Sequence, residues 1–364
     1  MIDFDKIEVW MHGMQVGQLA LTPSRPSVCA FQYTSEWLSS GFSISPFELP
    51  LTSDLKIAAW QPFAGNFGVF ADSLPDGWGQ LVLHRYLLSK GVDSRNLSIL
   101  QLLCLVGSNG RGALEYRPDH SLRNSAGFPD FERLAAETEA ILENDRFQGE
   151  HLEELVQRGG SPGGARPKIF IDYEGAEWLV KFRARGDGID VGKREYECSL
   201  LAKKCGVEMP ETRLFDDKWF GVKRFDRSAT GKVHIVSASG LLRADYTFPC
   251  IDYLHLFEIS IRLSHSVEEL WKIYRLMCFN VLIGNRDDHA RNFSFLYDGE
   301  WCLSPAYDLL PCGREGDYHT TSVNDNPLPG FNDILQLARR VGLPEADATR
   351  VYNEMKEIVV NALQ

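Results

Sequence analysis

A loop too rich in glycine to form a helix or a strand lies near the middle of this 364-residue sequence. Four of the seven residues at positions 159–165 are glycine, which favours turns and close backbone approaches over regular structure. Two strand-like runs follow at residues 168–173 and 177–182, on either side of a short turn at Gly175. The pattern predicts an adaptable loop that leads directly into a β-hairpin.

The segments around this loop predict a chain of three parts. Short strand-like runs dominate the beginning of the sequence, and helical periodicity dominates its end. A polar stretch at residues 117–130 is the first candidate boundary. We therefore expect an α+β fold with a β-rich amino-terminal subdomain at 1–118, a small α/β lobe at 119–225 and an all-helical lobe at 226–364.

Local signals set the expected bounds of several elements. A hairpin turn is expected at residues 12–14, and a helix at 80–90 should end at Gly91. Further on, residues 266–269 fit a capping box for a helix that should end at Gly284. Three other expected features are a helix that begins with Glu195, a helix capped by Asn332 and a last helix with Pro344 in its first turn.

Composition excludes several classes of protein. The 38 Lys and Arg against 50 Asp and Glu give a net charge of −12, which is unfavourable for a free-standing nucleic-acid binder. The acidic first residues do not resemble a signal peptide, and no run approaches the roughly 20 apolar residues of a membrane span. Eight scattered cysteines without a C-x-x-C pair indicate reduced core thiols. We expect a soluble cytoplasmic protein without structural zinc.

Four features along the chain match the requirements of phosphoryl transfer from ATP. The reaction needs flexible backbone amides over the phosphates, a cation beside them, an acceptor for the substrate hydroxyl proton and oxygen ligands for Mg²⁺. In chain order, the sequence offers the glycine loop with Ser161, then Lys181, the polar segment 287–292 and Asp308. Each feature alone also has an ordinary structural explanation. The prediction of phosphoryl transfer therefore depends on the order of the four features along the chain.

Lys181 ends a strand whose neighbouring residues are apolar, where an ammonium group needs an anionic partner. A solvated strand-end lysine is the simpler alternative. Glu195 and Glu197 open the following helix and are the candidate partners, although acids are favoured in a first helical turn for other reasons. Residues two apart on a helix point in different directions, so only one of them should reach Lys181.

The segment 287–292 is the strongest local signal. Asp287 and Asn292 are five residues apart, the spacing of a kinase catalytic loop in which the acid accepts a proton and the amide holds magnesium. A hairpin at 293–303 would return Asp308 to the same place as a second oxygen ligand. The alternative is that the segment is only a structural polar turn. A zinc site at His289 is not expected, because no second histidine or cysteine lies at ligand spacing on this segment.

Taken together, these segments resemble the HipA family of toxin kinases along nearly the whole chain. The resemblance is carried by residues 160–168, 178–182, 222–227, 283–293 and 304–308, and in the amino-terminal part by residues 70–79 and 106–113. It implies a kinase-like fold and assigns Asp287 as the catalytic acid, Lys181 as the phosphate-binding lysine and Glu195 as its partner. Magnesium ligands would be Asn292 and Asp308. ATP would also contact Ser161, Gly163, Gly164, Ala165 and Lys168 in and after the loop, and the backbone of Lys223 and Phe225 at the adenine hinge.

The resemblance further implies a serine/threonine protein kinase toxin that uses ATP and Mg²⁺ and phosphorylates itself on Ser161, which switches it off. A small helix-turn-helix antitoxin of the HipB type would be its partner and its link to DNA, and an aminoacyl-tRNA synthetase the kind of target. Lys223 stands where the best-known member has an acid, and the chain is shorter at its carboxyl end. A small-molecule kinase and a catalytically silent antitoxin-binding pseudokinase remain the alternatives.

Overall fold

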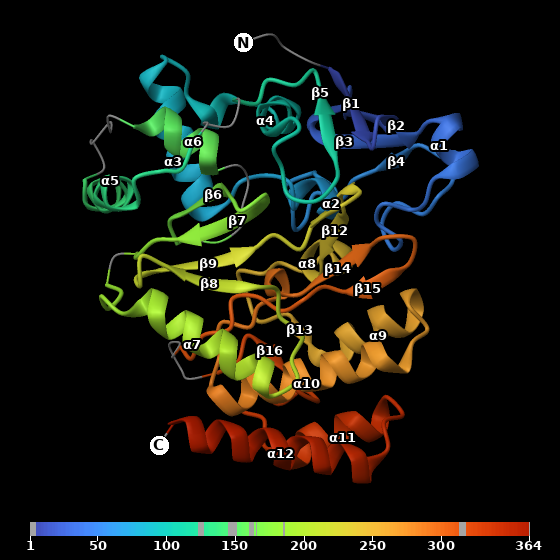
Figure 1. Ribbon diagram of the computed structural model, residues 1–364. Helices are drawn as coiled ribbons and strands as arrows, with labels where there is room; N and C mark the ends of the chain where they lie inside the picture. Colours follow the sequence, from blue (N-terminus) through green and yellow to red (C-terminus); the bar gives the residue numbers. More distant parts are fainter. Residues whose placement is uncertain are drawn as a thin grey trace. The chain divides into compact units, whose positions relative to one another are not determined.

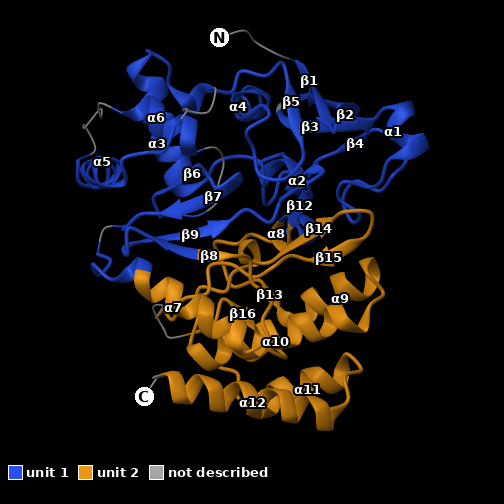
Figure 2. Cartoon of the chain, viewed as in Figure 1, with its two compact units in different colours: residues 1–192, 213–236, 240–243 blue, residues 193–212, 237–239, 244–364 orange. Residues whose placement is uncertain are grey.

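In the computed structural model, which describes residues 5–122, 127–144, 151–159, 164, 166–184, 186–312 and 318–363, the chain divides into two units. The first unit holds residues 1–192, 213–236 and 240–243, and the second holds residues 193–212, 237–239 and 244–364 (Figure 2). The β-rich amino-terminal part and most of the glycine-loop lobe therefore belong to the same unit. The three sets of bounds expected from the sequence stay a prediction.

A five-stranded antiparallel sheet forms the amino-terminal part of the first unit (Figure 1). His12 and Gly13 connect its first two strands, and both have positive φ angles, +50° and +78°, as a two-residue hairpin turn requires. The predicted hairpin is thus confirmed. In the order β4-β3-β2-β1-β5, the strands are Lys56–Ile57, Arg25–Tyr33, Met14–Thr22, Lys6–Met11 and Glu115–Arg117.

Short helices join and cover these strands. The predicted helix at 80–90 is α3, which begins three residues earlier, at Gly77, and is followed by Gly91 with a φ of +78°. A capping box between Ser98 and Gln101 starts α4. The helices of this part are α1 (Ser35–Ser40), α2 (Gly68–Ala71), α3 (Gly77–Ser89), η1 (Ser94–Asn96) and α4 (Ile99–Val106).

The glycine-loop lobe is built on a four-stranded sheet with the order β6-β7-β9-β8. Its strands are β6 (Lys168–Tyr173), β7 (Ala176–Lys181), β9 (Trp219–Lys223) and β8 (Thr212–Phe215). Helices α5 (Phe131–Glu143) and α6 (Leu152–Gly159) precede it, and α6 packs against both α3 and β6 (Figure 1). Buried aromatic residues fill the core between these helices and the sheet, namely Trp78, Phe131, Trp178, Phe182, Phe215 and Trp219.

The segment after residue 226 forms further short strands before the helices begin. These are β10 (Arg227–Ser228), β11 (Gly231–Lys232) and β12 (His234–Ser237). The second unit is mainly helical, with most of α7 (Val191–Lys204) and with α9 (Tyr253–Leu263), α10 (Val267–Ile283), α11 (Phe331–Arg340) and α12 (Glu345–Leu363). The residues of α8 (Ala238–Leu242) are divided between the two units. The second unit also contains the predicted hairpin of β14 (Ser294–Tyr297) and β15 (Trp301–Leu303), and a parallel pair of β13 (Ile251–Asp252) and β16 (Thr321–Ser322).

The expected starts of the last three helices are wrong in detail. Ser266 is the N-cap of α10 but its side chain caps nothing, and Glu269 instead accepts a hydrogen bond from Leu303 N at 2.5 Å. Asn332 lies inside α11, whose N-cap is Gly330, and Pro344 precedes α12 rather than lying in its first turn. Glu269 is thus engaged by a residue distant in sequence, and Gly330 takes the N-cap position expected of Asn332.

Among the described residues, no helix combines the length and the hydropathy that crossing a membrane requires. All eight cysteines are free thiols in this structure. Cys29, Cys104, Cys198, Cys205 and Cys278 are buried, whereas Cys250 is exposed. Burial raises the pKa of the Cys29 thiol to about 12, so that group behaves as a core side chain.

Glu48, whose side chain is 9% exposed, holds the start of α2 in the first unit. Its Oε2 accepts a hydrogen bond from Gly68 N at 2.7 Å, and Arg243 Nε lies 3.5 Å from Oε1. Burial outweighs these two interactions and raises the pKa of the carboxyl group to about 7. The folded state therefore favours the protonated form of Glu48, and this contribution to stability is present below the ordinary carboxyl pKa and lost as the pH rises through about 7.

We predict that Glu48→Gln removes this pH-dependent loss, because a glutamine keeps the acceptor for Gly68 N and carries no charge. The free energy of unfolding of the variant minus that of the wild type should increase between pH 4 and pH 8, by about 3 kcal/mol at most. Urea denaturation at several pH values measures the difference. Glu36→Gln, at an exposed acid of α1, is the control. An equal difference between variant and wild type at both ends of the range would contradict the prediction.

Candidate active site

The polar segment 287–292 begins directly after α10. That helix ends at Gly284, which has the left-handed φ of +69° common for a helix C-terminus. Asn285 follows and is buried. Its amide nitrogen donates to Asn280 Oδ1 at 3.0 Å, and Asn280 in turn donates to the hydroxyl of Tyr253 at 2.8 Å. The start of the segment is thereby fixed to α10 and α9.

Asn285 also connects the residues that the sequence assigned to catalysis and metal binding. Its Oδ1 accepts from Asp287 N at 3.3 Å, and its Nδ2 donates to the backbone oxygen of Asp308 at 3.3 Å. The side-chain nitrogen of Asn292 donates to the backbone oxygen of Asp287 at 2.8 Å. Asp287, Asn292 and Asp308 therefore lie together, as the hairpin argument predicted.

Asp308 has an unusual backbone conformation for a residue with a side chain. Its φ is +55°, and such angles in non-glycine residues concentrate at functional sites. A second tie holds the same segment, because the Tyr307 hydroxyl donates to Arg291 O at 2.9 Å and lies 2.6 Å from Ser294 Oγ. The β14–β15 hairpin thus returns the chain to the polar segment 287–292. The side chain of Tyr307 is held there by Arg291 and Ser294.

The two adjacent acids of the segment have opposite environments. The Asp287 side chain is exposed, whereas Asp288 is fully buried. The Asp288 carboxylate accepts hydrogen bonds from four donors, which are Tyr253 OH at 3.2 Å, His319 Nδ1 at 3.0 Å, Thr320 N at 2.9 Å and Thr321 N at 3.2 Å. Its backbone oxygen accepts a further bond from the Thr321 hydroxyl. Asp288 is the structural acid of the pair.

His319 is oriented by its two neighbours. An arginine can only donate, so the 2.7 Å contact between Arg286 Nη1 and His319 Nε2 makes Nε2 the acceptor and leaves the proton on Nδ1, facing Asp288. Burial, and then the charge of Asp288, raise the pKa of the Tyr253 hydroxyl well above its ordinary value, so it remains a donor. No local sequence pattern indicates this network, because the residues that donate to the Asp288 carboxylate lie more than 30 positions away from it.

In the first unit, two lysines of the glycine-loop lobe face each other. Lys168 and Lys181 are directly paired across β6 and β7, so their side chains lie on the same face of the sheet. They are 3% and 9% exposed. Two ammonium groups at this depth require negative charge close by. Sequence reasoning identified both residues but not that they form a pair.

Gly164 lies against this pair. A Cβ atom at Gly164 would be 2.7 Å from Lys168 Nζ, and the residue has a φ of +100°, which side chains rarely adopt. Its backbone is held from the amino-terminal subdomain: Gly164 N donates to Asp76 Oδ1 at 2.5 Å, and Trp78 N donates to Gly164 O at 3.3 Å. Asp76 is the N-cap residue of α3, yet its side chain does not cap that helix.

The remaining predicted residues are placed as follows. Lys223 ends β9 opposite Trp178, and both it and Phe225 are half-buried. Glu195 lies in the second turn of α7 rather than at its start, and it is buried, whereas Glu197 is exposed near Lys193. Burial thus favours Glu195 over Glu197 as the partner of a buried cation, and the pairing with Lys181 stays a prediction. Ser161, Gly163 and Ala165 lie outside the described residues.

A small sheet with paired lysines and a helical unit with a catalytic-type polar loop define a protein-kinase-like class of fold. Two family models cover most of the chain. The HipA N-terminal domain matches residues 7–117, and the HipA-like C-terminal domain matches residues 160–363, more than half of the sequence. The chain belongs to the HipA family, and the resemblance inferred from its motifs is confirmed.

Individual relatives agree with this assignment. The serine/threonine-protein kinase toxin HipA of Shewanella oneidensis is 22% identical over 98% of this chain and 89% of its own length. Y4mE of Sinorhizobium fredii is 28% identical over 94% of this chain and 83% of its own length, and Y4dM of the same organism is 25% identical over 66% and 61%. Among solved structures, HipA in the complex of S. oneidensis HipA, HipB and operator DNA superposes with a TM-score of 0.73, at 19% identity and with coverage of 98% and 90%. That likeness shows the fold, so the predicted α+β, kinase-like architecture is confirmed.

We predict that Asp288→Asn destabilises the second unit by about 3 kcal/mol, because an amide nitrogen would face donors that the carboxylate now satisfies. Urea denaturation followed by tryptophan fluorescence measures the loss. Asp298→Asn, at an exposed acid in the turn between β14 and β15, should change the free energy of unfolding by less than about 0.5 kcal/mol. Equal stability of the two variants would show that the buried network does not hold the segment.

Proposed function

We propose that this chain is an ATP- and magnesium-dependent serine/threonine protein kinase that transfers the γ-phosphate of ATP to a protein hydroxyl. The observation that carries the proposal is the hydrogen-bonded arrangement of Asp287, Asn292 and Asp308 around Asn285. It combines one exposed acid with an amide and a second acid, which are the groups that a kinase catalytic loop requires. Membership of the HipA family supports the same reading.

The side chains supply distinct parts of this reaction. Asp287 accepts the proton of the substrate hydroxyl, since its carboxylate is exposed while its backbone is fixed. Lys168 and Lys181, which are paired across β6 and β7 and lie on one face of the sheet, bind the phosphates. The carbonyl of Lys223 and the N–H of Phe225 bind adenine, so the lysine side chain at position 223 is compatible with the role. Glu195 orients Lys181.

The oxygen ligands fit magnesium. The nitrogen of the Asn292 amide is engaged with Asp287 O, which directs the amide oxygen away from that carbonyl. One amide oxygen and the Asp308 carboxylate form a small, hard set of ligands of the kind that Mg²⁺ prefers. When bound, the ion would neutralise charge on the phosphates.

The partners in this proposal follow from the family and from charge. HipA of S. oneidensis has been solved with HipB and operator DNA, and we propose a HipB-like helix-turn-helix antitoxin as the partner of this chain. With a net charge of −12, the chain would reach DNA through that antitoxin rather than directly. The proposed target is an aminoacyl-tRNA synthetase in the cytoplasm, which makes the chain the toxin of a toxin–antitoxin system.

Asp287→Ala should abolish phosphate transfer, because the variant lacks the group that takes the hydroxyl proton. We expect a loss of about 10²–10⁴-fold in turnover, with the fold retained, since the side chain is exposed. Incubation with labelled ATP and a cell lysate, followed by identification of the labelled species, measures both the rate and the acceptor. Asp298→Ala is the matched control. Wild-type turnover in Asp287→Ala would refute the assignment, and a labelled small molecule in place of a protein would refute the proposed substrate class.

Ser161 is expected to be an autophosphorylated off-switch. A phosphate there adds nearly two negative charges to a loop that must itself surround the γ-phosphate, so repulsion should expel the loop and stop the reaction. Mass spectrometry of protein incubated with ATP should show modified Ser161, and no modification in Ser161→Ala or Asp287→Ala. An unmodified serine in active protein would contradict the prediction. So would a phosphorylated form that turns over ATP at the unmodified rate.

A further inference from the structure

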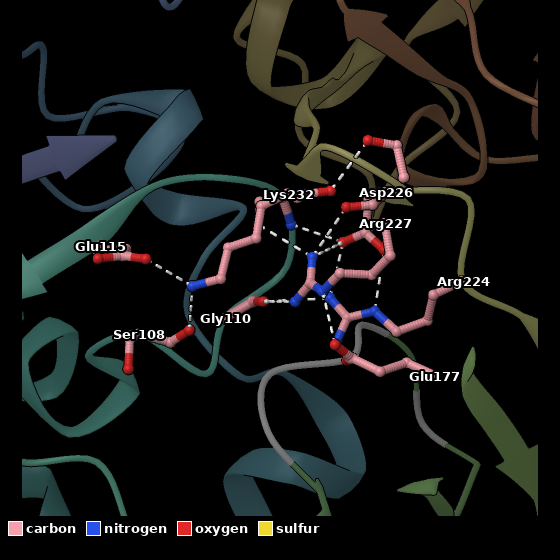
Figure 3. Close-up of polar contacts among 11 residues, drawn as sticks. Ser108, Gly110, Glu115, Glu177, Arg224, Asp226, Arg227 and Lys232 are labelled. Carbon is pink, nitrogen blue, oxygen red and sulfur yellow. Dashed lines mark hydrogen bonds and ion pairs between the residues drawn. The ribbon is translucent and has the colours of Figure 1, made fainter. Parts of the chain in front are cut away.

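Four charged side chains form ion pairs with one another directly after β9, the strand that ends at Lys223 (Figure 3). We call them the ion group; its members are Glu177, Arg224, Asp226 and Arg227. Arg224 contacts Asp226 through two bonds of 2.7 and 2.9 Å, and Arg227 contacts the same carboxylate at 3.1 Å. Both arginines also contact Glu177, at 2.9 and 3.0 Å. Two positive and two negative charges therefore balance within one group.

Most of this group is hidden from solvent. The side chains of Arg224 and Asp226 are 6% and 7% exposed. Burial alone would raise the pKa of the Asp226 carboxyl, but the charges and hydrogen bonds of Arg224 and Arg227 and the bond from Gly112 hold it well below its usual range. Asp226 is thus ionised in the folded protein. A buried ion group gives little net stability over a well-packed apolar core, so its value lies in what it fixes.

The group fixes a loop of the amino-terminal subdomain to the strand. Gly112 N donates to Asp226 Oδ2 at 2.7 Å, and both arginines donate to Gly110 O at 3.2 Å. Arg227 also donates to Gly112 O at 3.2 Å. Gly112 has a φ of +72°, and a Cβ there would lie 2.7 Å from the Ile235 side chain, so this close approach depends on glycine.

Lys232 holds the same loop from a second side. Its ammonium group donates to Ser108 O at 2.6 Å and to Glu115 Oε1 at 2.7 Å, as Figure 3 shows. Lys232 lies on β11, and the adjacent residue, Val233, donates its N–H to Asp226 O at 3.0 Å. On the other side, Arg224 N donates to Glu177 O at 2.9 Å. The backbone of residues 224–226 is thereby held by β7, by Val233 directly after β11 and, through side chains, by the loop.

We propose that loop 108–112 is a positioning element for adenine recognition, with Asp226 as the positioning residue that passes its constraint to the hinge at 223–225. The inference rests on the proposed function, which assigns the Lys223 carbonyl and the Phe225 N–H to adenine. Arg224 lies between these two groups and Asp226 follows them, so the loop contacts both residues that flank the Phe225 peptide. A donor and an acceptor that read a base must be held within about 0.5 Å.

This arrangement makes base selectivity the property to measure. Adenine offers an amino donor where guanine offers a carbonyl acceptor, so a fixed hinge distinguishes ATP from GTP. The triphosphate is the same in both nucleotides and contacts Lys168 and Lys181 elsewhere in the lobe. Loosening the loop should therefore weaken ATP binding more than GTP binding, whereas a general loss of stability would weaken both alike.

Two variants loosen the loop to different degrees. Arg227→Lys keeps the positive charge but loses the guanidinium group, whose several N–H donors bond Gly110, Gly112 and Glu177 at the same time. Lys232→Met keeps the whole ion group and removes only the bonds to Ser108 and Glu115. The matched control is Lys218→Met, since Lys218 is also a lysine of this unit in an ion pair, with Glu132 at 2.8 Å, and it does not contact the loop. Dissociation constants for Mg-ATP and Mg-GTP are measured by calorimetry on full-length protein, beside the thermal unfolding midpoint.

We expect the ATP preference over GTP to fall about fivefold or more in Arg227→Lys and about two- to threefold in Lys232→Met, as lost hydrogen bonds of ordinary strength would give. Lys218→Met should keep the wild-type ratio. An unchanged ratio in folded Lys232→Met overturns the inference, and so does a wild type that binds both nucleotides equally, although the kinase proposal would survive either result. Should Arg227→Lys not fold, Lys232→Met decides. A wild type that binds neither nucleotide refutes the proposed function and the inference together.

Discussion

A buried carboxylate must have its oxygen atoms occupied by donors, and this constraint organises the functional segments of both units. In the second unit Asp288 receives bonds from two backbone N–H groups, a tyrosine and a histidine. In the first unit Asp226 receives bonds from two arginines and one backbone N–H. Each acid lies next to a residue proposed for the reaction, Asp287 in one case and Phe225 in the other. A polar network therefore holds the backbone beside each of these two proposed site residues.

Besides its own sheet, the amino-terminal subdomain supplies contacts that hold two segments of the glycine-loop lobe. Asp76 and Trp78 hold the backbone of Gly164, and Gly110 and Gly112 are bound to the hinge segment through Arg224, Asp226 and Arg227. Both contacts are made by the sequence stretches 70–79 and 106–113. Bound in this way, the subdomain and the glycine-loop lobe form one unit. Glycine at position 112 is explained by a close approach, because a Cβ there would lie 2.7 Å from the Ile235 side chain.

Local chemistry predicted the features that depend on neighbours in sequence. The hairpins at His12-Gly13 and at Glu174-Gly175 have the positive φ angles that their sequences indicate, and Gly284 ends α10 as expected. The capping box at Ser266 failed because Glu269 is used by Leu303 and Lys272 instead. Asn285, His319 and the lysine pair could not be identified from spacing, since each gains its role from residues brought near by the fold. Sequence reasoning therefore named the candidate reacting groups, whose roles stay a prediction, and missed most of the contacts that hold them.

The pair Asp287-Asp288 shows how the fold assigns roles that adjacent identical residues leave open. In this loop one acid is directed into the protein and the other toward solvent. Asp288 is surrounded by donors, so no oxygen remains for a substrate proton. The backbone of Asp287 is fixed by Asn285 and Asn292 while its carboxylate stays exposed. Because its four donors occupy the oxygens of Asp288, Asp287 is the acid of the pair whose carboxylate is open to a ligand, and this difference is why the proposed reaction is assigned to Asp287.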